Sequence, residues 1–298
     1  MDGFDGRIEV EGCDTIPKLF WHQVKARDER TAFREKYLGI WRATSWRDYG
    51  EQARAVGMGL VKLGLKRGDV VSILAETVPE WLYADMATAC AGGVTNGIYP
   101  TDSAKQVDYI VNDSRSRFLF VEDEEQLDKW LDVRDRCPSL TRIFVFDMEG
   151  LADFNDPMVM PIDELMALGR EHDKASPSDW EKLIAGSAPE DLALLVYTSG
   201  TTGPAKGAMI SHRNVIFQLH NADAFIPLGS DDEQLAFLRS ATSPSAPSPP
   251  SCRCVPARSR TSPRASRPCR RTYARWRRPP SSPCRASGNA SIPASPSA

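Results

Sequence analysis

Residues 69–99 read DVVSILAETVPEWLYADMATACAGGVTNGIY, and this stretch predicts a strand, a helix and a second strand in close succession. The first strand is the apolar run at residues 69–74. Pro79 follows, at a position where the first turn of a helix tolerates a missing N–H. Gly92 ends the helix, and residues 94–99 form the second strand. A strand, a crossover helix and a strand of this length predict a βαβ unit with parallel strands.

The alternation of helix and strand continues on both sides of this unit. Upstream, a hairpin is expected around Gly39, followed by a helix with a capping-box pattern at Ser45 that ends at Gly64. Downstream, short connections join a further series of elements. This series consists of a helix at 104–112, a strand at 118–121, an acidic helix at 124–136 and a strand at 142–146. The expected fold class is α/β, a mostly parallel sheet with helices on both faces. Residues 150–189 are mixed polar and apolar with several Pro, and are expected to cross the surface before the next strand.

The next strand, residues 192–197, runs directly into a loop rich in hydroxyl groups and glycine. This loop reads TSGTTGPAKG at residues 198–207 and holds four hydroxyls, three glycines and one lysine. Free backbone N–H groups, hydroxyl donors and one cation suit the oxygens of a polyphosphate. It is not a Walker A sequence, because Lys206 follows Ala205 and precedes Gly207. The loop is therefore a candidate phosphate site, and the structural alternative is a surface turn.

The residues around this loop resemble a known family. Residues 197–207, followed by AMISH ending at His212, are similar to the AMP-binding signature of the adenylate-forming enzymes. These include acyl-CoA synthetases, peptide-synthetase adenylation domains and luciferases. The stretch GIYPTDSA at residues 97–104, with residues 112–114, resembles the long-chain fatty acyl-CoA synthetase branch in particular. The resemblance covers about residues 14–238.

The resemblance implies a two-step ligation. A fatty acid carboxylate attacks the α-phosphate of ATP, bound with Mg²⁺, to give acyl-adenylate and pyrophosphate; coenzyme A then displaces AMP and forms the thioester. It also implies a set of residues that hold the nucleotide phosphates: Thr198, Ser199, Gly200, Thr201, Thr202, Gly203 and Lys206. The Thr198 hydroxyl is in addition a candidate magnesium contact. The family usually has Pro where Ala205 stands, and this departure leaves Lys206 in register.

Two other features have a structural alternative: the GMGLVK segment favours a structural role, and the role of His212 stays open. Residues 57–62, GMGLVK, begin like a dinucleotide fingerprint but lack its last glycine and lie inside an expected helix. His212 follows the loop on an expected helix, where it could line the site or serve the fold.

The last 60 residues differ sharply in composition from the rest. Residues 239–298 hold 12 Arg, 12 Pro and four Cys, with no Asp, Glu or Lys. Of the 37 Lys+Arg, 25 therefore stand in residues 1–238 with all 40 Asp+Glu, so the body has a net charge of −15 and the tail +12. We predict that residues 1–238 are the N-terminal part of an AMP-binding domain and residues 239–298 a disordered Arg/Pro/Ser-rich tail.

The tail has the composition of a GC-rich gene read out of frame. Back-translation, joining the third base of each codon to the first two bases of the next, permits LGHIAERTF from residues 239–248. Residues 282–294 likewise permit AVPRIWERFYSG, and both peptides resemble acyl-CoA synthetases. We therefore hypothesise a frame slip near Leu238. The family's later magnesium-binding Glu, ribose-binding Asp and catalytic Lys are then missing, so the chain is expected to be truncated, inactive alone and without a retained catalytic residue.

Composition also limits where the protein is expected to act. No run approaches the about 20 apolar residues of a membrane span, and residues 1–3 open no signal segment, so a cytoplasmic location is expected, with peripheral membrane contact left open. The three body cysteines have no C-x-x-C pair and are expected to be reduced.

The expected partner is a fatty acid, and no nucleic acid is expected. The sequence does not indicate an oligomeric state. Two alternatives stay open: a non-catalytic nucleotide-binding or basic nucleic-acid-binding protein, and an adenylating ligase for a different carboxylate.

Overall fold

The computed structural model describes residues 8–198, 204–225, 232–236, 252–256 and 259–260. The chain divides into one compact unit, Met1–Thr261, and a second, Ser262–Ala298. All described residues belong to the first unit.

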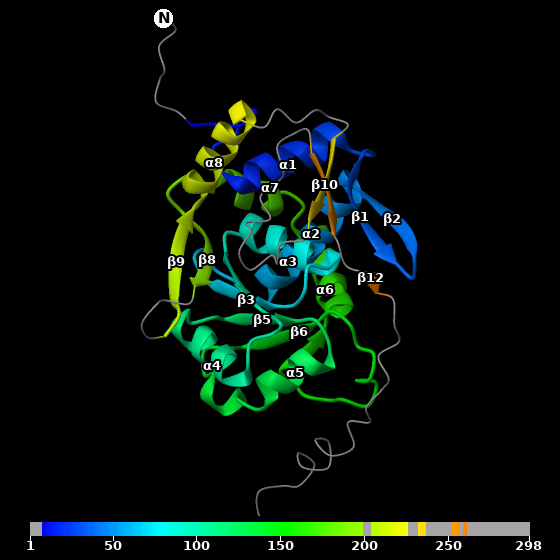
Figure 1. The fold of residues 1–298 in the computed structure, drawn as a ribbon, viewed down its shortest axis with the longest axis vertical. Helices are drawn as coiled ribbons and strands as arrows, with labels where there is room; N and C mark the ends of the chain where they lie inside the picture. The colour runs from blue at the N-terminus through cyan, green and yellow to red at the C-terminus, as the bar shows by residue number, and fades with distance from the viewer. Residues whose placement is uncertain (1–7, 199–203, 226–231, 237–251, 257–258, 261–298) are drawn as a thin grey trace, which may run out of the picture. The chain divides into compact units, whose positions relative to one another are not determined.

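A seven-stranded sheet forms the centre of this unit, in the order β7-β6-β5-β3-β4-β8-β9 (Figure 1). Every neighbouring pair is parallel except β8 and β9. The strands are β3 (Val70–Leu74), β4 (Val94–Ile98), β5 (Phe118–Val121), β6 (Arg142–Val145), β7 (Val159–Pro161), β8 (Leu192–Thr198) and β9 (Lys206–Ser211). The predicted series of parallel strands is confirmed.

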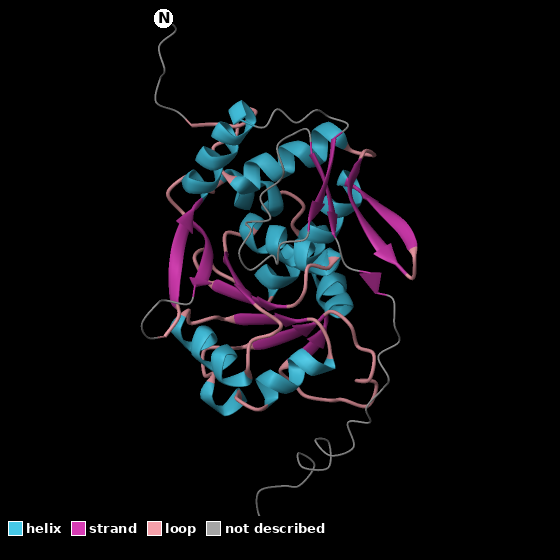
Figure 2. Cartoon of the chain, viewed as in Figure 1, coloured by secondary structure: helices cyan, strands magenta, loops and turns pink. Residues whose placement is uncertain are grey.

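Helices cover both faces of the sheet, as the sequence predicted (Figure 2). Along β5, Leu119 and Val121 pack on one face with Trp130, whereas Phe118 and Phe120 pack on the other with Leu165. This division follows from the alternation of side chains along a strand. The first face carries α4 (Ala104–Asp113) and α5 (Glu124–Leu131), which a short 3₁₀ turn at Arg134–Arg136 follows; the second carries α2 (Trp46–Lys62), α3 (Pro79–Cys90) and α6 (Ile162–Ala175). The remaining helices are α1 (Ile16–Arg27), α7 (Asp179–Ala185) and α8 (His212–Phe225).

The local signals that predicted the helices are visible in their ends. The Ser45 hydroxyl accepts a hydrogen bond from the Asp48 N–H at 3.0 Å and donates to its carboxylate at 2.7 Å, so the predicted cap of α2 is formed. Pro79 begins α3. Gly92 has φ of +83°, the left-handed conformation that glycine adopts at low cost after a helix.

The region 150–189, expected to cross the surface, contains β7, α6 and α7, and α6 packs part of it against the core. Helix α6 turns a small apolar face, Ile162, Leu165, Met166 and Gly169, towards the core. A Cβ on Gly169 would lie 1.8 Å from the Ala55 carbonyl oxygen, and one on Gly59 would lie 2.5 Å from that of Leu165. The two glycines therefore let the backbones of α2 and α6 approach closely, which supports the structural interpretation of the GMGLVK motif.

A smaller sheet contains the predicted hairpin, which is confirmed. Strands β1 (Thr31–Tyr37) and β2 (Ile40–Ser45) are antiparallel. The sheet has the order β10-β11-β1-β12, with β10 (Asp232–Ala236), β11 (Cys252–Pro256) and β12 (Ser259–Arg260) parallel to their neighbours. Strands β11 and β12 lie within residues 239–298, the tail that the sequence predicts to be disordered, and that prediction stays a prediction. The rest of the tail lies outside the described residues.

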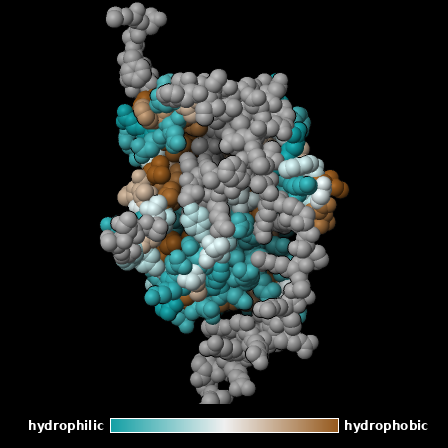
Figure 3. All heavy atoms as spheres, viewed as in Figure 1, coloured by the Kyte–Doolittle hydropathy of each residue, from teal (hydrophilic) through white to brown (hydrophobic). Residues whose placement is uncertain are grey.

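Some large apolar side chains stay on the surface. Leu38, Ile40 and Trp41 are exposed at the tip of the β1–β2 hairpin, where Figure 3 shows a brown projection at the right edge. Met209 on β9 and Phe217 on α8 are also exposed. None of the helices in the described ranges is long and apolar enough to cross a bilayer. Cys13, Cys90 and Cys137 are free thiols, as predicted, and all three are buried.

Candidate functional site

The β8–β9 hairpin holds the two ends of the candidate phosphate loop. Thr198 is the last residue of β8 and Lys206 the first of β9, and they are direct cross-strand partners. Both are exposed. Cross-strand partners project from the same face of a sheet, about 5 Å apart at their Cβ atoms. The hairpin thus places one hydroxyl and one ammonium group side by side at the mouth of the loop.

The other predicted phosphate-binding residues, Ser199, Gly200, Thr201, Thr202 and Gly203, lie outside the described residues. The structure therefore brings together the two ends of the predicted site, Thr198 and Lys206. Among the described residues, the Lys206 ammonium has neither a hydrogen-bond acceptor nor an ion-pair partner.

The loop opens at the same edge of the sheet as the second predicted motif. Strands β4 and β8 are parallel, with Thr95 paired to Leu194 and Asn96 to Leu195. Their carboxyl ends therefore lie next to each other, and residues 99–103 follow β4 at this edge. Ligands of open parallel sheets bind beyond the carboxyl ends of the strands, so the two motifs lie where such a site is expected.

Two tyrosines and an aspartate, none of them in the predicted site, contact the ends of the loop. The Tyr109 hydroxyl of α4 donates to the Ala205 carbonyl oxygen at 2.9 Å. The Tyr197 hydroxyl of β8 donates to the Asp113 carboxylate of α4 at 2.6 Å. The two tyrosine rings meet edge to face, with centroids 6.5 Å apart and planes at 88°. A Cβ on Gly207 would lie 3.0 Å from the Tyr197 ring, so glycine lets β9 lie close to that ring.

The environment of Tyr197 keeps its hydroxyl a donor. Tyr197 is buried, and burial, together with the charge of Asp113 and its hydrogen bond, raises the pKa of the phenol well above its usual range. The hydroxyl stays protonated at neutral pH. The only sequence signal for this arrangement is the spacing of Tyr109 and Asp113, which are four residues apart on an amphipathic helix.

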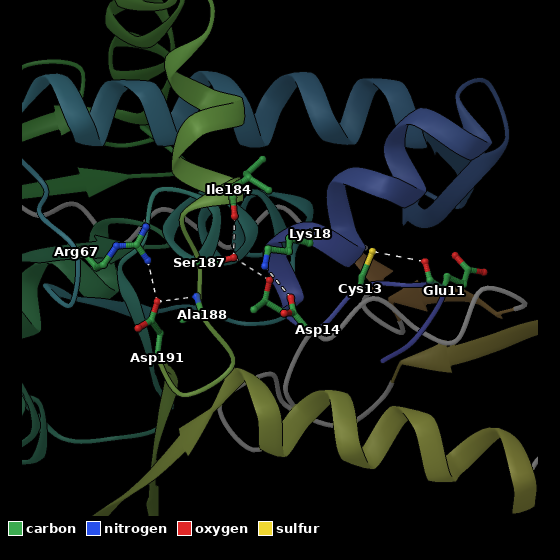
Figure 4. Close-up of polar contacts among 10 residues, drawn as sticks. Glu11, Cys13, Asp14, Lys18, Arg67, Ile184, Ser187, Ala188 and Asp191 are labelled. Carbon is green, nitrogen blue, oxygen red and sulfur yellow. Dashed lines mark hydrogen bonds and ion pairs between the residues drawn. The ribbon is translucent and has the colours of Figure 1, made fainter. Parts of the chain in front are cut away.

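A polar cluster fixes the chain just before β8 (Figure 4). The Arg67 guanidinium lies 2.8 Å from the Asp191 carboxylate, which also accepts a hydrogen bond from the Ala188 N–H at 3.0 Å. The Ser187 hydroxyl donates to the Ile184 carbonyl oxygen at 2.7 Å and lies 2.8 Å from the Thr15 hydroxyl. Further along the figure, Lys18 pairs with Asp14, and Cys13 lies 3.7 Å from the Glu11 carbonyl oxygen. The turn that enters β8 is therefore tied to α1 and to the segment before β3.

His212 belongs to this cluster rather than to the loop. It is the first residue of α8, its side chain is buried with 2% exposed, and its backbone N–H donates to the Asp191 carbonyl oxygen at 3.1 Å. Burial lowers the pKa of the imidazole to about 4, with Asp191 opposing the shift and Arg67 adding to it. The side chain is therefore neutral at neutral pH. The sequence left open whether His212 lines the site or serves the fold, and its burial favours a role in the fold.

The described donor set fits a nucleotide phosphate with its magnesium ion. The described ranges contain no group of three or more His, Cys, Asp or Glu side chains placed to hold a metal ion. Mg²⁺ is commonly held by one or two protein oxygens, waters and substrate phosphates, so a single threonine hydroxyl beside a lysine is compatible with it. The exposed Lys206 ammonium supplies a charge opposite to that of the phosphates.

Comparison with protein families gives one match over most of the chain. Residues 20–242 match the family of AMP-binding enzymes. The chain belongs to the AMP-binding enzyme family. The matched range contains the whole β8–β9 hairpin and all residues of the candidate site.

Curated relatives of this AMP-binding protein include long-chain-fatty-acid–CoA ligases. It is 35% identical over 201 residues to ACSBG2 of Xenopus laevis, a match that covers 67% of this chain and 26% of the relative. It is 31% identical over 227 residues to FadD15 of Mycobacterium bovis, covering 76% of this chain and 36% of the relative. The chain thus spans about a quarter to a third of the length of these relatives.

Solved structures show the same fold. The anthranilate CoA ligase AuaEII, solved in complex with anthranoyl-AMP, aligns with a TM-score of 0.64 at 23% identity, over 76% of this chain and 40% of that chain. The luciferase-like enzyme of the mealworm Zophobas morio aligns with a TM-score of 0.67 at 16% identity, over 87% of this chain and 56% of that chain. At these identities the likeness confirms the predicted fold.

Proposed function

We propose that this chain contains the nucleotide-phosphate site of a long-chain fatty acid–CoA ligase, and that the loop from Thr198 to Lys206 holds the phosphates of ATP. The observation that carries the proposal is the pairing of Thr198 with Lys206 at the mouth of a hydroxyl-rich loop, at the carboxyl edge of a parallel sheet. The family match over residues 20–242 and the long-chain ligases among the relatives support it.

The proposed roles follow from the chemistry of each group. Lys206 would neutralise charge on the β- and γ-phosphates, and its ammonium has no competing described partner. The hydroxyl and backbone N–H groups of Ser199–Gly203 would donate to the phosphate oxygens. The Thr198 hydroxyl would contact Mg²⁺. When bound, ATP would supply the electrophilic α-phosphorus that a fatty acid carboxylate attacks, before coenzyme A takes the acyl group as a thioester.

The first experiment measures the affinity of the 298-residue chain for ATP in the presence of Mg²⁺ by isothermal titration calorimetry. Lys206→Ala is expected to weaken binding about tenfold or more, because a charge-assisted hydrogen bond contributes about 1.5–3 kcal/mol. Lys62→Ala is the matched control, since Lys62 is an exposed lysine at the end of α2. Equal affinities of the Lys206→Ala variant and the unmodified chain would contradict the assignment.

The acyl substrate and the complete reaction belong to the proposal as well. The names of the curated relatives favour a long-chain fatty acid, whereas AuaEII shows that the fold also serves an aromatic acid. We expect residues 1–298 to bind ATP. Assay of this chain with ATP, coenzyme A and palmitate tests whether thioester formation accompanies that binding. Cytoplasmic location and peripheral membrane contact stay predictions.

A further inference from the structure

Helix α4 contacts the candidate phosphate loop at both of its ends. Tyr109 and Asp113 are four residues apart and therefore lie on the same face of the helix. Tyr109 donates to the carbonyl oxygen of Ala205, immediately before Lys206. Asp113 accepts from the hydroxyl of Tyr197, immediately before Thr198. One rigid element thus fixes the backbone next to each of the two described site residues.

We propose that Tyr109 and Asp113 are positioning residues, which with Tyr197 form a clamp that holds the phosphate loop ready for the nucleotide. This inference rests on the proposed function and goes beyond it, since neither residue is assigned to the loop. The Tyr109–Tyr197–Asp113 clamp thus acts on the described backbone at Tyr197 and at Ala205.

The contacts suit such a role better than a general contribution to the core. Tyr109 is 37% exposed and Asp113 is exposed, so neither residue belongs to the buried core. Tyr197 is buried and points its hydroxyl at Asp113, while its ring lies against the edge of the Tyr109 ring and against Gly207. Holding the ends of a loop in their bound positions lowers the entropy lost on binding, so the clamp should act on ATP affinity.

Helix α4 also links the loop to the other motif at this edge of the sheet. The helix begins directly after residues 99–103, and its first turn is closed by a capping box. The Ser103 hydroxyl accepts from the Gln106 N–H at 3.4 Å, and the Gln106 side chain accepts from the Ser103 N–H at 2.9 Å. The clamp residues are therefore anchored to the segment that follows β4, next to the proposed nucleotide site.

The experiment compares Tyr109→Phe and Asp113→Asn with a matched control, Tyr49→Phe. The Tyr49 hydroxyl also donates to a backbone carbonyl, that of Leu82, at 3.2 Å, but on the opposite face of the sheet. Two quantities are measured for the 298-residue chain without and with ATP and Mg²⁺: amide hydrogen exchange of peptides covering residues 197–211, and the dissociation constant of ATP. The midpoint of urea unfolding is recorded for each variant.

The clamp predicts a specific pattern. In Tyr109→Phe and Asp113→Asn, exchange in residues 197–211 accelerates several-fold, exchange in β3 and β5 is unchanged, and ATP binds about five- to tenfold more weakly. Tyr49→Phe changes neither the local exchange nor the ATP affinity. The double variant loses less than the product of the two single effects, because both residues hold the same loop.

Other patterns would overturn the clamp or the function separately. Local exchange at the unmodified rate in both variants would overturn the clamp, whatever happens to ATP. Faster local exchange with unchanged ATP affinity would overturn its role in nucleotide binding. Faster local exchange in a chain whose unmodified form binds no ATP would support the physical clamp and overturn the proposed function.

Discussion

At the scale of single residues, His212 makes the free energy of unfolding depend on pH. Its pKa of about 4 in the folded chain lies below the value of about 6.5 for an unfolded histidine. The unfolded chain therefore binds more protons between these two pH values, and the free energy of unfolding falls as pH falls through this window. The contribution of His212 to the free energy of unfolding is fully present above pH 6.5 and is lost at about pH 4. It amounts to up to about 3 kcal/mol.

The measurement is the free energy of urea unfolding at several pH values from 7.5 to 4.5, for the unmodified chain and His212→Gln. Glutamine keeps a polar side chain but does not titrate. The difference between the two curves is expected to favour the variant progressively below pH 6.5, which separates His212 from the carboxylates that titrate in both proteins. Parallel curves would show that the imidazole does not carry this dependence.

Individual residues also show where sequence reasoning reached its limit. Thr198 and Lys206 could be predicted because they belong to a continuous motif, and the structure places them opposite each other. The contact between Tyr109 and Ala205 could not, because 96 residues separate them and nothing in the local pattern of either pairs them. Such a contact arises only when the sheet brings α4 beside the β8–β9 hairpin.

At the scale of elements, the glycine contact between α2 and α6 makes a sharp prediction. Gly169→Ala would raise helix propensity by about 1 kcal/mol at an open site. Here the added methyl would meet backbone atoms of Ala55 and Gly59 that cannot rotate away. We expect the substitution to lower the free energy of unfolding by about 1–3 kcal/mol, as overpacking does.

Chemical unfolding checks this expectation, with Glu171→Ala as the control on the exposed side of the same helix. The control should change the free energy of unfolding by less than about 0.5 kcal/mol. A Gly169→Ala chain as stable as the unmodified one would mean that α2 and α6 can separate at little cost.

The elements that sequence reasoning found and missed differ in the strength of their local signal. Strands β3, β4 and β5 are buried apolar runs bounded by glycine, proline or polar residues, and their positions were predicted within about two residues. Helix α6 was missed although Ile162, Leu165, Met166 and Gly169 recur at helical spacing, because the other ten of its 14 residues are not buried. Strand β9 has no buried residue, so it lacks the alternation that marks a strand with one buried face.

At the scale of the whole molecule, two boundaries for the tail compete. Composition places the end of the body at Leu238, whereas β11 and β12 pair with β1 and the compact unit ends at Thr261. Limited trypsin digestion of the 298-residue chain, followed by mass spectrometry, distinguishes them, because arginines occur on both sides of Thr261. If the strand pairs form, cleavage at Arg253 and Arg260 is at least tenfold slower than at Arg264 and Arg285, since a protease needs locally unfolded chain. Equally fast cleavage at Arg239, Arg253 and Arg264 would instead place the boundary at Leu238.

Strand β1 also connects the tail strands to the core, because its Phe33 packs against Tyr49. Protection of Arg253 from trypsin should therefore disappear at the same urea concentration at which that core unfolds.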